Sequence, residues 1–178
     1  ESTPSLLNDI ELINSKAQNA EGMVGLVYMK MKDLQQIFVS SKQRAKNIRV
    51  EEILSKIQSI YAKSYKEKDI SVEIVKEGNS PVIAKTIDAV LFQVFINLFD
   101  NALYWLSLQD SKREVKIFLN SNDQTITFSD NGPGVTMEDA PFVFDAFYSG
   151  KGEEGRGLGL YIAKIFLNRY KYNIEILT

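Results

Sequence analysis

Asp130-Asn131-Gly132-Pro133-Gly134 directly follows the alternating segment from Thr125 to Ser129. A strand that ends in this way turns its backbone sharply, and glycine permits the positive φ and the close approach of a ligand that such a turn requires. A carboxylate at the strand end can accept a hydrogen bond from an exocyclic amine, so Asp130 is a candidate for binding adenine. An ordinary Asx turn after a strand has the same residues, so this motif alone is a weak indication.

A helical segment upstream of this turn, Ala89 to Leu106, is apolar nearly all round and is therefore expected to be buried. It carries Asn97 and Asn101, which are four residues apart and share one face, and Asp100, which borders that face. Buried amides and carboxylates need partners. Oxygen donors of this kind suit Mg²⁺, which takes few protein ligands and keeps phosphate oxygens and water for the rest. Hydrogen bonds from the Asn pair to a neighbouring loop would satisfy the same groups, and both interpretations stay open at this point.

A glycine-rich element, Gly155-Arg156-Gly157-Leu158-Gly159-Leu160, runs directly into an amphipathic helix. Free N–H groups and the positive dipole end at a helix N-terminus hold phosphates well. The element is neither a P-loop, which needs Gly-Lys-Ser/Thr, nor a dinucleotide fingerprint, which needs a preceding strand. A glycine-rich hinge that caps a helix is the alternative interpretation.

The remaining periodicity predicts the other elements of an α+β fold. The expected order is helix Val50–Lys66, strands Ile70–Val75 and Val82–Ala84, helix Ala89–Leu106, strands Val115–Leu119 and Thr125–Ser129, helix Leu158–Tyr170 and strand Ile174–Leu177. This order predicts a two-layer α/β sandwich, in which helices stack on one face of a mixed sheet.

The first part of the chain has a different pattern. Its apolar residues recur at steps of four and three, in a heptad stripe typical of a coiled coil or four-helix bundle: Leu6, Ile10, Ile13, Ala17, Ala20, Val24, Val27, Met31, Leu34 and Phe38. We expect residues 1–47 to form a long dimerisation helix followed by a solvated connector, Ser40 to Asn47, and residues 48–178 to form a second domain. A homodimer through this helix is favoured, because the chain has no other long helix to match it. Packing of the helix on the chain's own second domain is the alternative.

The composition excludes several classes of function. With 25% charged residues and a net charge of −2, the chain gives no electrostatic case for nucleic acid or an anionic membrane as its main partner. It has no cysteine and no histidine, which excludes disulfides, thiolate metal sites and imidazole general bases. No apolar run is expected to reach the length of a membrane span. The chain starts at Glu1 without Met, so we expect it to be part of a longer protein, and a membrane tether elsewhere stays open.

Together, the motifs resemble the conserved boxes of the GHKL superfamily, which includes histidine kinases, Hsp90, DNA gyrase B and MutL. Residues 97–102 resemble the N box, residues 130–134 the G1 box, and residues 155–160, followed by Ile162-Ala163, the G2 box. The stretch Phe144 to Lys151 is similar to the F box of histidine kinases. The resemblance covers about Val50 to Thr178. The kinase branch is favoured because Asn97 stands where the ATP-hydrolysing branches typically have a Glu that activates water.

This resemblance implies the Bergerat ATP-binding fold and the catalytic domain of a sensor histidine kinase, which transfers the γ-phosphate of ATP to a His in two-component signal transduction. The implied ligands are ATP and Mg²⁺, bound under a lid over residues 135–154, and the implied protein partner is a response regulator. Asn101 would hold Mg²⁺, Asn97 would support the site, and Asp100 would orient the acceptor. The other implied nucleotide-binding residues are Asp130, Gly132 and Gly134 at adenine, Phe144 and Phe147 as anchors of the lid, and Lys151, Arg156, Gly157, Leu158, Gly159 and Leu160 at the phosphates.

Two features depart from the family pattern. Histidine kinases usually carry Lys three residues after the second Asn of the N box, whereas this chain has Tyr104 there, so Lys151 or Arg156 would have to supply the charge. The N-terminal heptad helix resembles the second helix of the dimerisation and phosphotransfer hairpin of histidine kinases. This resemblance implies that the acceptor His lies on the first helix of that hairpin, before residue 1, and the chain itself contains no His. The alternative functions are a nucleotide-binding pseudokinase that uses ATP as a conformational ligand, and an ATPase or protein-serine kinase on the same fold. We expect a cytoplasmic location for this segment.

Overall fold

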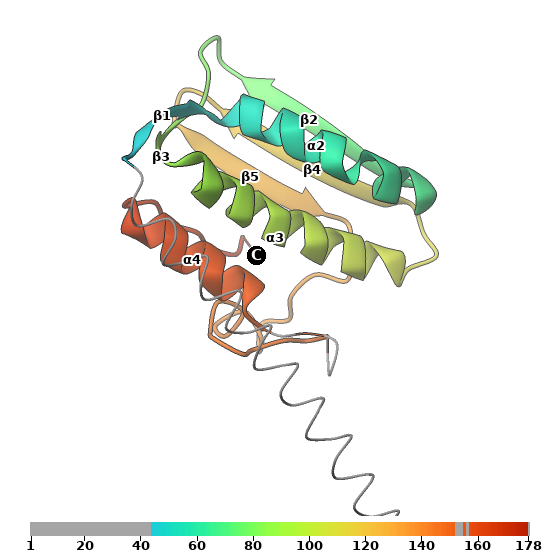
Figure 1. The fold of residues 1–178 in the computed structure, drawn as a ribbon. Coiled ribbons are helices and arrows are strands. Elements are labelled where there is room, and N and C mark those ends of the chain that lie inside the picture. Colours follow the sequence, from blue (N-terminus) through green and yellow to red (C-terminus); the bar gives the residue numbers. More distant parts are fainter. Residues whose placement is uncertain (1–43, 152–154, 156, 178) are drawn as a thin grey trace, which may run out of the picture. The chain divides into compact units, whose positions relative to one another are not determined.

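The computed structural model describes residues 44–151, 155 and 157–177 (Figure 1). Its elements are β1 (Lys46–Arg49), α2 (Val50–Glu67), β2 (Ile70–Glu77), β3 (Ile83–Thr86), α3 (Asp88–Ser107), β4 (Arg113–Asn120), β5 (Thr125–Asp130) and α4 (Gly159–Arg169). The predicted helices and strands between Val50 and Tyr170 are therefore confirmed. The predicted dimerisation helix lies outside the described residues.

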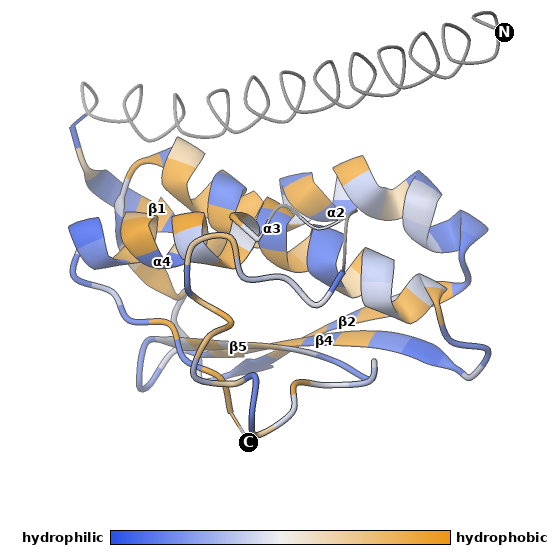
Figure 2. Cartoon of the chain, turned by 90° about the horizontal axis from the view of Figure 1, so that it is seen from below, coloured by the Kyte–Doolittle hydropathy of each residue, from blue (hydrophilic) through white to orange (hydrophobic). Residues whose placement is uncertain are grey.

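A mixed three-stranded sheet forms one layer of the fold. β2 and β4 pair in parallel, from Ile70 opposite Arg113 to Glu77 opposite Asn120, and β5 pairs antiparallel with β4. Alternate residues of a strand point to opposite faces of a sheet, and on the central strand β4 the buried ones are Val115, Ile117 and Leu119. Figure 2 shows the helices stacked over one face of this sheet, so the predicted two-layer sandwich is confirmed.

The core fills the space between the sheet and α2 and α3. Seven residues of α3 are buried: Val90, Leu91, Val94, Phe95, Phe99, Ala102 and Leu106. The ring of Phe99 packs against Tyr65 of α2 and Phe128 of β5, with centroid distances of 5.7 and 5.3 Å. Length and composition alone would allow α3 to cross a membrane, which the sequence analysis did not expect. Because α3 packs against the sheet and both neighbouring helices, we interpret it as the central core helix of the domain.

β1 corrects the prediction of a solvated connector that ends at Asn47. Lys46 and Asn47 belong to a strand that pairs antiparallel with β3, and Ile48 of the same strand is buried in the core. Lys46 Nζ also forms an ion pair of 2.7 Å with the carboxylate of Asp88. These partners lie about 40 residues further along the chain, so the local charge pattern could not reveal them.

The strand predicted over Ile174 to Leu177 is not formed. Residues 172–177 have no regular secondary structure and pair with none of the described strands. Alternating hydrophobicity is not sufficient for a strand, because its backbone groups need a neighbour with which to hydrogen-bond. The segment is instead tied to β3 through the hydroxyl of Tyr172, which accepts a hydrogen bond of 2.7 Å from the backbone N–H of Lys85.

Candidate functional site

The polar face of α3 meets the start of α4. Asn97 Nδ2 donates a hydrogen bond of 2.7 Å to the carbonyl oxygen of Gly159, and Asn97 Oδ1 accepts one of 3.1 Å from Gln93 Nε2. A Cβ added at Gly159 would lie 3.5 Å from the Asn97 amide, so the two elements approach closely. The N-box and G2-box residues predicted to share a site therefore lie in contact.

The second N-box amide, Asn101, faces a cation. Lys151 Nζ donates a hydrogen bond of 2.8 Å to Asn101 Oδ1 and lies 4.5 Å from the centroid of the Tyr104 ring. Lys151 is half-buried, and this burial lowers the pKa of its ammonium group, an effect that the charge of Asp100 partly opposes. The amide oxygen predicted to be a metal ligand thus already points to a positive charge.

Trp105, which the sequence analysis did not select, joins the G1 turn and the F box to α3. A Cβ at Gly132 would lie 3.6 Å from Trp105 Cβ, and a Cβ at Gly150 would lie 3.4 Å from its indole ring. Trp105 follows Asn101 by four residues, so the helical spacing that paired Asn97 with Asn101 could have identified it.

The G1 turn is held by its own side chains. Asp130 Oδ1 accepts a hydrogen bond of 2.9 Å from the N–H of Gly132, and the amide of Asn131 bonds the backbone of Lys112 and of Glu114, each at 2.7 Å. Gly134 has a φ of +74°. The ordinary Asx turn, which was the alternative interpretation of this motif, is therefore present. Asp130 nevertheless remains exposed, so its carboxylate can accept a further hydrogen bond from a ligand.

The F box and the G2 box meet at a tight backbone contact. The N–H of Phe147 donates a hydrogen bond of 2.8 Å to the carbonyl oxygen of Gly157, and both residues have positive φ, 69° and 62°. The two predicted anchors of the lid differ, because Phe144 is buried whereas Phe147 is 60% exposed. Phe144 also has Lys164 Nζ at 5.4 Å from its ring centroid, so it packs within the fold.

The G2 box leads into α4, which begins at Gly159 without a side-chain cap. The first N–H groups of such a helix have no intrahelical acceptor and can bind an anion. Leu158 is buried and Leu160 is half-buried, so we assign any phosphate contact of these residues to their backbone. Arg156 lies outside the described residues.

Asp100 borders the site and contacts α2. The hydroxyl of Tyr61 donates a hydrogen bond to Asp100 Oδ1. Burial, followed by this hydrogen bond, raises the pKa of Tyr61, and burial likewise raises the pKa of Tyr65. Asp100 itself is exposed, so one of its oxygens can still accept a hydrogen bond from outside the domain.

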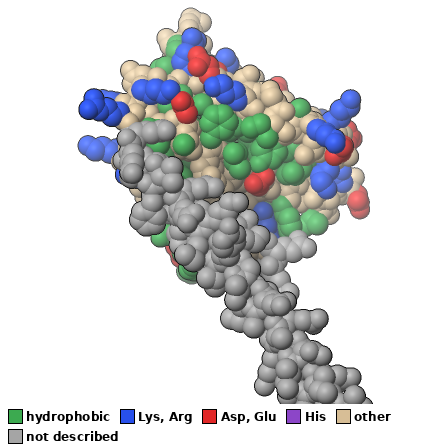
Figure 3. Space-filling model, viewed as in Figure 1, with side chains coloured by type: hydrophobic (Ala, Val, Ile, Leu, Met, Phe, Trp, Pro, Cys, Tyr) green, Lys and Arg blue, Asp and Glu red, His purple; other side chains and the backbone are tan. Residues whose placement is uncertain are grey.

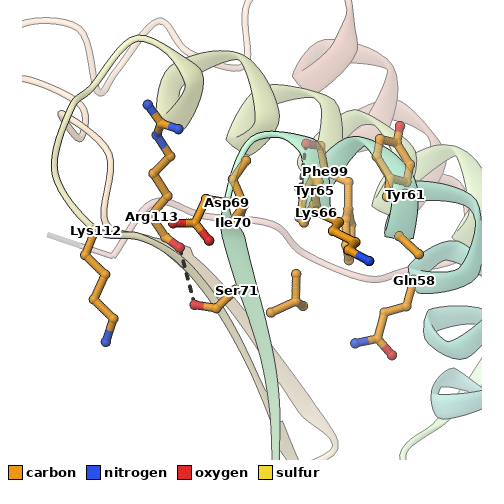
Figure 4. Close-up of a pocket in the computed structure, with 12 residues that line it drawn as sticks. Gln58, Tyr61, Tyr65, Lys66, Asp69, Ile70, Ser71, Phe99, Lys112 and Arg113 are labelled. Carbon is orange, nitrogen blue, oxygen red and sulfur yellow. Dashed lines mark hydrogen bonds between the residues drawn. The ribbon is translucent and has the colours of Figure 1, made fainter.

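A separate cavity of about 580 Å³ lies along α2, β2 and the start of β4 (Figure 4). It is lined by Gln58, Tyr61, Ala62, Tyr65, Lys66, Asp69, Ile70, Ser71, Val72, Phe99, Lys112 and Arg113, and by none of the predicted site residues. The guanidinium of Arg113 is bonded to the carbonyl oxygen of Lys68 at 2.6 Å, and Lys112 is paired with Glu114 at 2.6 Å. Two of the three basic side chains that line the cavity, Lys112 and Arg113, are therefore already bonded to other protein groups. We place the candidate site where the N, G1, F and G2 boxes meet instead.

The surface charge has no dominant sign on the face shown in Figure 3. Hydrophobic side chains gather there over α2 and α3, and Lys, Arg, Asp and Glu alternate around them. This mixture gives the described part of that face no extended field of one sign.

The donor set of the site fits a metal carried by a nucleotide. Among the described residues, no group of three or more His, Cys, Asp or Glu could hold a metal ion. A metal at Asn101 would therefore take most of its ligands from phosphate and water, as Mg²⁺ does. The ammonium of Lys151 at Asn101 Oδ1 shows that this oxygen is oriented towards a cation.

This combination of fold and site occurs in a known family of ATP-binding domains. The sequence profile described as "Histidine kinase-, DNA gyrase B-, and HSP90-like ATPase" matches residues 86–177, which include α3, the G1 turn and α4. The chain belongs to this family of ATP-binding domains.

Sensor kinases are among its relatives. The chain is 28% identical over 172 residues to the sensor protein KdpD of Clostridium acetobutylicum, a match that covers 93% of this chain and 18% of KdpD. It is 40% identical over 101 residues to the swarming motility regulation sensor protein RssA of Serratia marcescens, covering 55% of this chain and 21% of RssA. The chain thus spans about a fifth of the length of these curated relatives.

Solved structures of histidine kinases share the fold. The nucleotide-free catalytic domain of ThkA has a TM-score of 0.60 and 18% identity, over 71% of this chain and 83% of that domain. Full-length ShkA in complex with AMPPNP has a TM-score of 0.61 and 18% identity, over 89% of this chain and 33% of ShkA. ThkA in complex with the response regulator TrrA has a TM-score of 0.51 and 15% identity, over 84% of this chain and 42% of that one.

Proposed function

We propose that this domain binds ATP with Mg²⁺ where α3, the end of β5 and the start of α4 meet, and that its full-length protein transfers the γ-phosphate to a His outside this segment. One observation carries the proposal. Three side chains of α3 contact the three other motifs: Asn97 contacts Gly159, Asn101 contacts Lys151, and Trp105 lies against Gly132 and Gly150.

Each group has a role that follows from its surroundings. Asp130 would accept a hydrogen bond from the adenine amine at the G1 turn, where Gly132 lies close to Trp105 Cβ. The free N–H groups at the start of α4 and the ammonium of Lys151 would bind the phosphates. Asn97, whose amide is used by Gln93 and Gly159, would hold the first turn of α4 in place.

Asn101 Oδ1 would hold Mg²⁺, which neutralises charge on the transferred phosphoryl group when it is bound. Protein groups in phosphoryl transfer mainly position the phosphates and stabilise charge, so the nucleophile would be the imidazole of the acceptor His. The exposed carboxylate of Asp100, with one oxygen bonded by Tyr61, would orient that imidazole. Arg156 at the phosphates stays a prediction from the sequence.

The partners follow from the same proposal. The structure of ThkA with TrrA is a complex of a histidine kinase with a response regulator, and it supports a response regulator as the partner of the full-length protein. The relatives' description as sensor proteins supports a role in two-component signal transduction. The homodimer through the predicted N-terminal helix and the cytoplasmic location of the domain also belong to this proposal.

Labelling with γ-labelled ATP tests the transfer. The full-length protein should acquire an acid-labile label, as phosphohistidine does, and Asn101→Ala should abolish it. Asn173→Ala is the matched control, since Asn173 is exposed, and it should leave the label unchanged. An acid-stable label would identify a serine or threonine kinase, and free phosphate without label an ATPase. Nucleotide binding with neither label nor phosphate release would identify a pseudokinase.

A further inference from the structure

We propose that Tyr104 is a positioning residue, whose ring holds the ammonium of Lys151 at the nucleotide site and so supplies, from a second position, the charge that position 104 lacks. This inference rests on the proposed binding of ATP with Mg²⁺. It gives a role to a residue that the sequence presents only as a departure from the family pattern.

The geometry is that of a cation–π contact. Lys151 Nζ lies 4.5 Å from the centroid of the Tyr104 ring, within the roughly 6 Å over which such contacts are favourable. Both residues are half-buried, which strengthens the attraction because less water competes for the ammonium. The Tyr104 ring is in turn placed by Trp105, with an edge contact at a centroid distance of 5.0 Å and an interplanar angle of 86°.

The second partner of Lys151 explains why the ring is needed. Lys151 Nζ also donates to Asn101 Oδ1, the proposed ligand of Mg²⁺. Two cations on one amide oxygen repel each other, so Lys151 would have to leave Asn101 when the metal binds there. The aromatic ring is not a ligand for Mg²⁺. The contact with Tyr104 therefore persists, and it keeps the ammonium beside the phosphates.

The charge of Lys151 is available to a ligand. Within the described part of the chain, none of the ion pairs includes Lys151. Asp100, whose charge acts on Lys151, accepts its hydrogen bond from Tyr61 instead. A flexible Lys stem with three donors can turn towards phosphate oxygens while its ammonium stays on the ring.

Calorimetric titration of the chain with ATP and Mg²⁺, and separately with adenosine, tests the inference. Tyr104→Leu should weaken binding of ATP about fivefold, the loss expected for a half-buried cation–π contact, and should leave adenosine binding unchanged. Tyr104→Phe keeps the ring and should bind ATP like the wild type. Tyr170→Leu, directly after α4, and Lys56→Met, at an exposed position of α2, are the controls and should leave ATP binding unchanged.

Two further variants distinguish positioning from packing. Lys151→Met should weaken ATP binding, and adding Tyr104→Leu to it should cost nothing more. Tyr104→Lys combined with Lys151→Met should restore much of the affinity, because the charge returns at the neighbouring position. Equal affinity of Tyr104→Leu and wild type, independent losses in the double variant, or no recovery with Tyr104→Lys would overturn the inference.

A graded measurement covers the case in which Tyr104→Leu does not fold. Phenylalanine with an increasing number of ring fluorines at position 104 keeps the shape of the ring and weakens its attraction for a cation. Affinity for ATP should fall stepwise with the number of fluorines, and a flat series would contradict the inference. Failure of the wild type to bind ATP would instead overturn the proposed function, together with everything that rests on it.

Discussion

The side-chain amide of Asn97 on α3 donates a hydrogen bond of 2.7 Å to the carbonyl oxygen of Gly159, the first residue of α4. This contact joins two motifs that are 62 residues apart in the chain. It fixes where the free N–H groups of α4 lie relative to the amide of Asn101. A side chain in the core helix therefore sets the position of the backbone groups proposed to bind phosphate.

Asn97→Ala should lower the free energy of unfolding by about 1 kcal/mol, because it removes this hydrogen bond and leaves a partly buried carbonyl oxygen without its donor. The same change should weaken binding of ATP, since the first turn of α4 loses its anchor. Urea unfolding and calorimetric titration measure the two effects. Asn168→Ala, at an exposed position of α4, is the control. Equal effects of the two variants would show that the contact with Gly159 is unimportant.

Gly157→Ala should destabilise the domain more than Gly134→Ala does. Both glycines have positive φ, so each substitution carries the strain of the left-handed region, roughly 1–2 kcal/mol. A Cβ at Gly157 would also lie 2.3 Å from the carbonyl carbon of Phe147, whereas a Cβ at Gly134 would meet nothing within 4 Å. Urea unfolding of the two variants gives the comparison. An equal loss in both would contradict the tight contact between the F box and the G2 box.

Stability should fall as the pH rises above about 10, the ordinary pKa of tyrosine. The pKa values of Tyr61 and Tyr65 are raised in the folded domain, chiefly by burial, so the folded state holds these protons more tightly than the unfolded chain. Their contribution is complete below the unfolded pKa and is lost at higher pH. Unfolding of the wild type and of Tyr61→Phe/Tyr65→Phe at neutral and alkaline pH measures it. The double variant should lose less stability on alkalinisation, and an equal loss would refute this assignment.

Affinity for ADP should decrease as the pH rises from neutral towards about 10, near the ordinary pKa of lysine. Burial lowers the pKa of Lys151, partly opposed by Asp100, so its ammonium deprotonates earlier than that of an exposed lysine. The neutral amine then attracts phosphate less. Titrations across this range should show the decrease in the wild type and a weaker one in Lys151→Met. Parallel curves for the two proteins would mean that another group controls the pH dependence.

Local periodicity predicted most of the fold, because the helices and the β4–β5 hairpin have patterns that neighbouring residues determine. It failed where pairing with residues far away in the sequence determines whether a segment forms a strand. β1 is a strand because it pairs with β3. The segment from Ile174 to Leu177 is not a strand, because none of the described strands pairs with it. A pattern in one segment carries no information about which partner it finds.

The residues of the candidate site likewise fall into those that the sequence indicates and those whose role depends on the folded chain. Asn97, Asn101, Gly157 and Gly159 could be selected from the sequence because their types and spacing are unusual for a buried helix or a helix start. The contacts of Trp105 with Gly132 and Gly150, and of Lys151 with Tyr104, depend on the folded chain. In the sequence, Tyr104 in place of the usual Lys indicates only that a positive charge is missing. The structure shows that the ammonium of Lys151 lies over the Tyr104 ring.

Calorimetric titration of the chain with ATP in the presence of Mg²⁺ tests the central claim most directly, with Trp105, the only tryptophan, as a fluorescent reporter beside the site. We predict binding to a single site, a change in Trp105 fluorescence, and weaker binding by Asp130→Asn, which keeps an acceptor for the N–H of Gly132 but presents a donor to adenine. Asp110→Asn, at an exposed position, should bind like the wild type. No heat and no fluorescence change at millimolar ATP would contradict the account.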